Sequence, residues 1–122
     1  MSSEKVILCV DDEVDILELF RDEFIDLGFK VLEASNGIDA FKLFKENDID
    51  CIVSDIRMPG GDGVSLVKNV KDEGSNVPIF LVTGFSDYSK EDLASLGINA
   101  VIFKPFDLDE VVQVITKTIT AN

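Results

Sequence analysis

The sequence CIVSD at residues 51–55 is a short apolar run that ends in a carboxylate, Asp55, and the turn sequence PGG follows at residues 59–61. A short apolar run bounded by turn residues is typical of a buried strand. Three further apolar runs also end in polar side chains: VILCV before Asp11 and Asp12, IFLV before Thr83, and VIF before Lys104. We therefore predict four parallel strands that end at one edge of a sheet, the edge at which open α/β sheets bind ligands.

Strand-like and helix-like segments alternate along the chain. Strands are predicted at residues 5–10, 29–33, 51–54, 78–82 and 100–103. Helices are predicted at residues 13–27, with Leu17, Phe20, Phe24 and Leu27 at helical spacing, at 36–47, from 62 onward, at 86–96 and from 107 onward. This pattern predicts a parallel sheet with helices on both faces and right-handed crossovers. Because the last predicted helix runs to the end of the sequence, we expect residues 1–122 to be a single domain with no output domain.

The composition excludes several classes of protein. A formal charge of −13 argues against direct binding to nucleic acid or to an anionic membrane surface, since both need basic patches. The absence of histidine excludes Ser-His-Asp and Cys-His nucleophile systems and a His-ligated zinc site. The N-terminus has no apolar leader, and Cys9 and Cys51 lie inside apolar runs. We therefore expect a cytoplasmic protein with two free, buried thiols.

Three carboxylates are predicted to meet at the carboxyl edge of the sheet, those of Asp11, Asp12 and Asp55. An aspartate at the start of a helix usually caps it, so Asp11 and Asp12 alone would mean little. Three carboxylates this close would raise the pKa of at least one of them unless a cation bound there. Their hard oxygen atoms suit Mg²⁺, and Mn²⁺ would also be accepted. Beside such an ion, Asp55 is a competent nucleophile toward phosphorus and would form an aspartyl phosphate.

Two later strands add a hydroxyl and an ammonium to the same edge. We expect the Lys104 side chain to point at Asp55, and Thr83 to end the neighbouring strand. Pro105 would turn the chain sharply after Lys104, a turn that a cis bond would allow. Gly84 leaves room for a phosphoryl group to approach the backbone.

In order along the chain, these residues resemble the signature of response-regulator receiver domains. The matching elements lie between about residues 4 and 120 and comprise Asp11-Asp12, Asp55, Met58-Pro59, Asp62-Gly63, Thr83 and Lys104-Pro105-Phe106. The resemblance implies a doubly wound (βα)₅ fold of the flavodoxin-like type with strand order 2-1-3-4-5. It also implies a phosphorelay, in which a histidine kinase or phosphotransfer protein supplies a phosphoryl group to Asp55. The modified domain would then switch its binding to a downstream protein whose identity the sequence does not reveal.

The same resemblance assigns roles to individual residues. It implies that Asp12 and Asp55 bind Mg²⁺ directly, that Asp11 acts through water, and that the backbone carbonyl of Arg57 completes the protein ligands. Thr83 and Lys104 would hold the phosphoryl oxygens.

One departure from the family pattern concerns Val101. The family usually has an aromatic residue or histidine three residues before the lysine, and a valine cannot swing like a ring. We therefore expect the switch to run through the loop after Thr83 and its Phe85. Arg57 and Phe85 would flank the pocket and alter the lifetime of the phosphoryl group.

We expect a signalling module that catalyses only its own phosphorylation and dephosphorylation, and three other functions are alternatives. A haloacid-dehalogenase-like phosphatase also uses an aspartyl nucleophile and Mg²⁺, but it shows Asp-x-Asp where this chain has Asp55-Ile56-Arg57. A flavodoxin-like electron carrier should have a loop rich in Ser, Thr and Gly where this chain has Asp11-Asp12-Glu13. A receiver scaffold that no longer signals is the third alternative, because Val101 replaces the usual aromatic residue.

Overall fold

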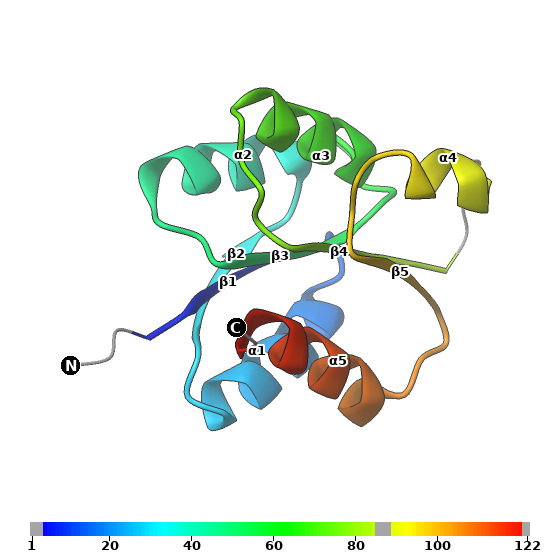
Figure 1. The fold of residues 1–122 in the computed structure, drawn as a ribbon. Helices are drawn as coiled ribbons and strands as arrows, with labels where there is room; N and C mark the ends of the chain where they lie inside the picture. Colours follow the sequence, from blue (N-terminus) through cyan, green and yellow to red (C-terminus); the bar gives the residue numbers. More distant parts are fainter. Residues whose placement is uncertain (1–3, 85–88, 121–122) are drawn as a thin grey trace.

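Five parallel strands form the centre of the molecule, and helices cover both faces (Figure 1). The computed structural model describes residues 4–84 and 89–120. Its elements are β1 (Val6–Val10), α1 (Val14–Asp26), β2 (Lys30–Ala34), α2 (Gly37–Glu46), β3 (Cys51–Asp55), α3 (Gly63–Asp72), β4 (Ile79–Thr83), α4 (Lys90–Ala94), β5 (Ala100–Phe103) and α5 (Leu108–Thr120). The strand order is β2-β1-β3-β4-β5, and all neighbouring strands are parallel. The predicted fold is confirmed.

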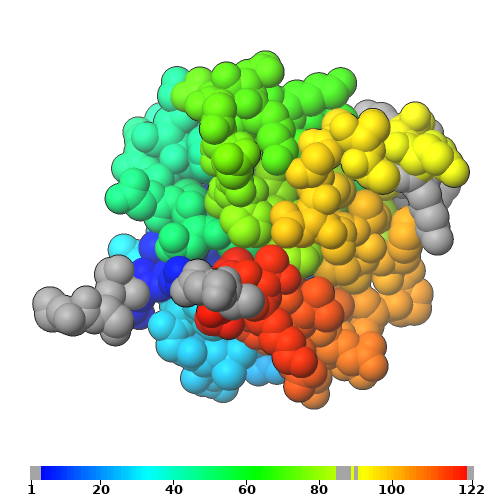
Figure 2. Space-filling model, in the orientation of Figure 1, coloured from blue at the N-terminus to red at the C-terminus, as the bar shows by residue number. Residues whose placement is uncertain are grey.

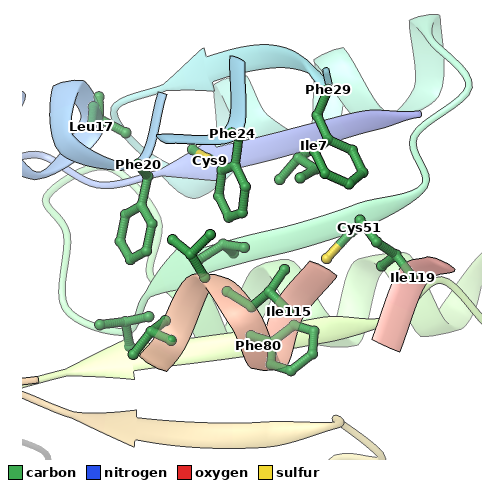
Figure 3. Close-up of a cluster of buried hydrophobic side chains, with 14 residues drawn as sticks. Ile7, Cys9, Leu17, Phe20, Phe24, Phe29, Cys51, Phe80, Ile115 and Ile119 are labelled. Carbon is green, nitrogen blue, oxygen red and sulfur yellow. The ribbon is translucent and has the colours of Figure 1, made fainter. Parts of the chain in front are cut away.

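Side chains of the central strands alternate between two hydrophobic layers, as the twofold repeat of a strand requires. In β1, Ile7 and Cys9 belong to the layer that packs against α1 and α5. Figure 3 is a close-up of this layer. Leu8 and Val10 join the layer on the other face, which packs against α2, α3 and α4. Every residue of β3 and β4 is buried. The strand that ends in Asp55 is thus fixed from both sides.

The helix on the first face is held by stacked aromatic rings. Phe20 of α1 stacks on Phe24 with ring centroids 5.9 Å apart, and on Phe106 at 5.7 Å. Phe106 follows the Lys104–Pro105 peptide bond, which is cis. These contacts tie the segment after β5 to α1, on the side of the molecule where the first strand also ends.

Polar caps start three of the helices at or next to their predicted first residues. The Asn36 side chain accepts a hydrogen bond from the Asp39 amide at 2.8 Å, and the Asp62 side chain accepts one from the Ser65 amide at 2.8 Å. Asp107 accepts from the Glu110 amide at 3.1 Å. Such caps satisfy amides that have no partner within the helix.

The predicted place of one side chain and the predicted length of one helix were wrong. Leu27 was expected on the apolar face of the first helix, but α1 ends at Asp26 and Leu27 is exposed. The chain reverses at Gly28, whose φ is +93°, and Phe29 takes the inner place, edge-on to Phe24 at 6.2 Å.

The fourth helix is shorter than the predicted residues 86–96. It begins after Ser89, which forms a capping box with Asp92, and it ends at Ala94. Residues 86–88, where the helix was predicted to begin, lie outside the described part of the chain. The capping box fixes the helix start because it satisfies the first free amides.

Both cysteines are free and buried, as predicted. Burial raises the pKa of the Cys9 thiol far above its usual range and that of Cys51 to about 12. Both thiols therefore stay protonated and behave as small apolar side chains. Among the helices of residues 4–84 and 89–120, none is long and apolar enough to span a bilayer.

Gly63 supports the backbone of Asp55 and provides a test of this packing. A Cβ added at Gly63 would overlap the Asp55 carbonyl oxygen. We predict that Gly63→Ala lowers the free energy of unfolding by ~1–3 kcal/mol, as overpacking in a core does. Urea unfolding followed by circular dichroism measures this, with Ser65→Ala on the exposed side of α3 as the control. Equal stability of the two variants would contradict the close contact.

Candidate functional site

Four polar residues come together at the carboxyl edge of the sheet. Asp11 follows β1, Asp55 ends β3, Thr83 ends β4 and Lys104 follows β5. The strand register makes them neighbours, since Asp55 pairs with Val82 and Thr83 pairs with Phe103. In addition, the Lys104 amide donates a hydrogen bond to the Thr83 carbonyl oxygen at 2.8 Å. The predicted convergence of these strand ends is confirmed.

Asp11, Asp12 and Asp55 form a cluster that could hold a divalent cation. One carboxylate oxygen from each lies within 4.8 Å of the other two. Asp11 and Asp55 are buried and Asp12 is exposed, so the cluster is open to water on one side. Mg²⁺ prefers this combination, because it binds to few carboxylates and keeps several waters. The residues present therefore fit the ion that the sequence predicts.

The Lys104 ammonium contacts two carboxylates of this cluster and one further acid. Its Nζ is 3.5 Å from Asp55 Oδ2, 3.7 Å from Asp11 Oδ2 and 3.8 Å from Glu13 Oε1. The second oxygen of Asp55, Oδ1, accepts a hydrogen bond from the Ile56 amide at 2.7 Å. The predicted approach of Lys104 to Asp55 is confirmed, and Asp55 is held at both oxygens.

Burial and charge together shift the acid–base equilibria of the site. Burial, together with repulsion from Asp55, raises the pKa of Asp11 to about 6 although the Glu13 amide opposes this. Burial also raises the pKa of Asp55, against the opposing effect of Lys104. For Lys104, burial alone would lower the pKa of the ammonium, but Asp11, Asp55 and Glu13 raise it. The sequence predicted raised carboxylate pKa values from mutual repulsion, whereas burial is the larger cause.

An open cavity of about 300 Å³ lies over these side chains. Its lining consists of Asp12, Glu13, Asp55, Arg57, Thr83, Gly84 and Lys104. Arg57 and Gly84 thus lie at the pocket, as predicted. Glu13 was missed, although its place directly after Asp11-Asp12 was a signal that a third acid could reach the same edge.

The remaining predicted residues lie farther from the carboxylates or outside the described chain. Val101 is half-buried on the opposite face of the sheet from α1, and it lines a second cavity of about 320 Å³ with Ala94 and Ile98. Pro105 is exposed. Phe85 lies outside the described residues.

Comparisons with known proteins agree with this geometry. The family model of the response regulator receiver domain matches residues 7–116. The chain is 33% identical over 115 residues to the chemotaxis protein CheY of Bacillus subtilis (strain 168), covering 93% of this chain and 96% of that protein. The solved structure of the response regulator protein TrrA from Thermotoga maritima in complex with Mg²⁺-BeF is 34% identical, with a TM-score of 0.82 over 93% of this chain and 97% of TrrA.

A longer relative contains a similar segment. The sensor histidine kinase RcsC of Escherichia coli (strain K12) is 30% identical over 116 residues, which cover 94% of this chain but 12% of RcsC. The fold, the strand-end cluster and these matches define one family. The chain belongs to the response regulator receiver domains. It is a phosphoacceptor module of two-component signalling rather than a conventional enzyme.

The raised pKa of Asp11 predicts how the stability of the metal-free protein depends on pH. Because its pKa rises from 3.8 to about 6 on folding, the folded protein binds more protons than the unfolded chain between these values. The free energy of unfolding should therefore fall as the pH rises through this range. Asp11→Asn should make the free energy of unfolding depend less steeply on pH. Urea unfolding in metal-free buffer from about pH 4 to pH 7 measures it, and an unchanged slope in the variant would contradict the shift.

Proposed function

We propose that Asp55 accepts a phosphoryl group from the phosphohistidine of a histidine kinase or phosphotransfer protein, in a reaction that requires Mg²⁺. The observation that carries the proposal is that the Asp55 carboxylate lies in the cluster with Asp11 and Asp12 and also 3.5 Å from the Lys104 ammonium. The product would alter binding to a downstream protein. Such a role fits the cytoplasm, where Cys9 and Cys51 would stay reduced.

The chemistry is an in-line displacement at phosphorus. An ionised oxygen of Asp55 attacks, a new O–P bond forms, and the P–N bond to the imidazole breaks with its electron pair leaving on nitrogen. The Ile56 amide and Lys104 hold the two oxygens of the nucleophile before attack. The backbone around Asp55 is fixed by Gly63, whose amide donates to the Ile56 carbonyl at 2.8 Å.

Mg²⁺ would be held by Asp12 and Asp55 directly, by Asp11 through water and by the backbone carbonyl of Arg57. When bound, it supplies positive charge for the phosphoryl oxygens and helps to align the displacement. In the titrating range of Asp11 and Asp55, protons compete with the cation for the same oxygens.

Lys104 and Thr83 would bind the transferred group. Lys104 lies 3.5 Å from Asp55 Oδ2, so an ammonium is already in place for the new negative charge. Thr83 ends the neighbouring strand and lines the same cavity. A contact between the phosphoryl group and Thr83 would favour one arrangement of the segment after β4, and this biases a two-state equilibrium.

The altered surface would be the one formed by α4, β5 and α5. Helices α4 and α5 lie on opposite faces of the sheet with the edge strand β5 between them, and the space-filling view shows their yellow to red atoms as a continuous surface (Figure 2). Val101 lines an open cavity at this surface together with Ala94 and Ile98, where a larger side chain would fill part of the space. The change would therefore travel through the segment after Thr83 and Phe85 without a rotating aromatic side chain at residue 101.

Phosphorylation by a small donor tests the acceptor directly. We predict that acetyl phosphate with Mg²⁺ adds one phosphoryl group to the parent chain and none to Asp55→Asn, as read by intact mass. Asp48→Asn, an exposed aspartate away from the cavity, should behave like the parent. Modification of the Asp55→Asn variant would contradict the assignment, and turnover of a generic phosphomonoester would instead favour a phosphatase.

Cation binding can be measured without phosphorylation. A ligand that binds only the folded state at ten times its dissociation constant stabilises by about 1.4 kcal/mol, which corresponds to a rise of ~5 °C in Tm for a domain of this size. We predict such a rise with Mg²⁺ near neutral pH and little or none in Asp12→Asn. An equal rise in parent and variant would exclude Asp12 as a ligand.

A further inference from the structure

Glu13 stands at the N-cap of α1, but its side chain does not cap the helix. It is the N-cap residue of α1, with φ −93° and ψ 112°, yet its carboxylate caps no amide of the first turn, all of which the structure describes. Helix N-caps favour the shorter Ser, Thr, Asp and Asn, whose oxygens reach those amides. Instead, Glu13 Oε1 lies 3.8 Å from the Lys104 ammonium. A residue that breaks a local rule and points into the site calls for a functional reason.

Three carboxylates share the one ammonium of Lys104, and they differ in their freedom to move. The Asp11 and Asp55 side chains are 4% and 9% exposed, whereas the Glu13 side chain is 63% exposed. The Glu13 backbone is fixed, because its amide donates to Asp11 Oδ1 at 2.9 Å. The carboxylate of Glu13 is therefore the partner that can leave when the charge at Asp55 changes.

A phosphoryl group on Asp55 would change the ion-pair partners of the Lys104 ammonium. Such a group carries roughly −1.5 to −2 charges and takes up positive partners around it. Both Glu13 and Lys104 line the 300 Å³ cavity into which the group would project. Lys104 must then turn from Glu13 to the phosphoryl oxygens.

We propose that Glu13 is a positioning residue that competes with the phosphoryl group for Lys104, an inference that rests on the proposed function of Asp55. In the unmodified protein Glu13 helps to hold the ammonium across the mouth of the cavity. In the modified protein it disfavours the phosphorylated state. The effect is modest, because water screens an ion pair whose partner is solvent-exposed.

The test uses Glu13→Gln, which keeps the size of the side chain and is an equally poor cap. Glu18→Gln is the matched control, because Glu18 is an exposed residue of the same helix and the change in net charge is identical. Fluoroberyllate with saturating Mg²⁺ serves as the phosphoryl analogue, and its dissociation constant is measured by NMR titration. We expect the dissociation constant of fluoroberyllate to be about two- to five-fold lower in Glu13→Gln than in the control, which is the range of an exposed ion pair.

A second readout separates contact with Lys104 from a merely structural effect. In the metal-free protein, the pKa of the Lys104 ammonium, followed through its ε-carbon NMR signal, should fall in Glu13→Gln and stay constant in Glu18→Gln. Glu13→Asp keeps the charge but is one methylene shorter and favours the cap, so it should follow Glu13→Gln in both measurements.

The outcomes are distinct. If the parent binds fluoroberyllate and Glu13→Gln binds it no more tightly than Glu18→Gln, the inference fails while the function of Asp55 stands. If Glu13→Asp retains the parent affinity, the contact with Lys104 is not responsible and the inference also fails. If the parent does not bind the analogue with Mg²⁺, the proposed function and the inference fall together.

Discussion

The burial of two carboxylates beside a single ammonium is the constraint on which this structure depends. Asp11 and Asp55 are 3% and 8% exposed, and ionised groups this deep are costly unless they are paired. Lys104 supplies part of the pairing at 3.7 and 3.5 Å, and a divalent cation would supply the rest. The site therefore holds more negative than positive charge, which a divalent cation would balance. A phosphoryl group on Asp55 would then compete with the carboxylates for the cation and for Lys104. The two hydrophobic layers keep the strand ends in place while this happens.

Much of the fold could be predicted because each local signal agreed with the global arrangement. Apolar runs of three to five residues predicted four of the strands, and the polar residue at the end of each run indicated the edge where the site lies. Asn36 and Asp107 marked helix starts because their side chains can reach free amides. The meeting of Asp55 and Lys104 could be predicted because both residues stand at strand ends on the same edge of the sheet.

Features that depend on tertiary contacts could not be predicted. Leu27 fitted the helical spacing, but a glycine with positive φ reverses the chain and Phe29 fills the inner place. Glu13 looked like one more acid at a helix start, since its reach to Lys104 depends on how the segments that follow β1 and β5 approach each other across the carboxyl edge of the sheet. The main cause of the raised pKa of Asp11 is burial, which a sequence indicates less directly than charge.

The most direct measurement is a crystal structure of the protein with Mg²⁺ and fluoroberyllate. We predict a metal ion among the carboxylates of Asp11, Asp12 and Asp55, a beryllium atom joined to an oxygen of Asp55, and the Lys104 ammonium in contact with a fluorine atom. A beryllium adduct on another carboxylate, or a Lys104 that keeps all its present partners, would contradict it.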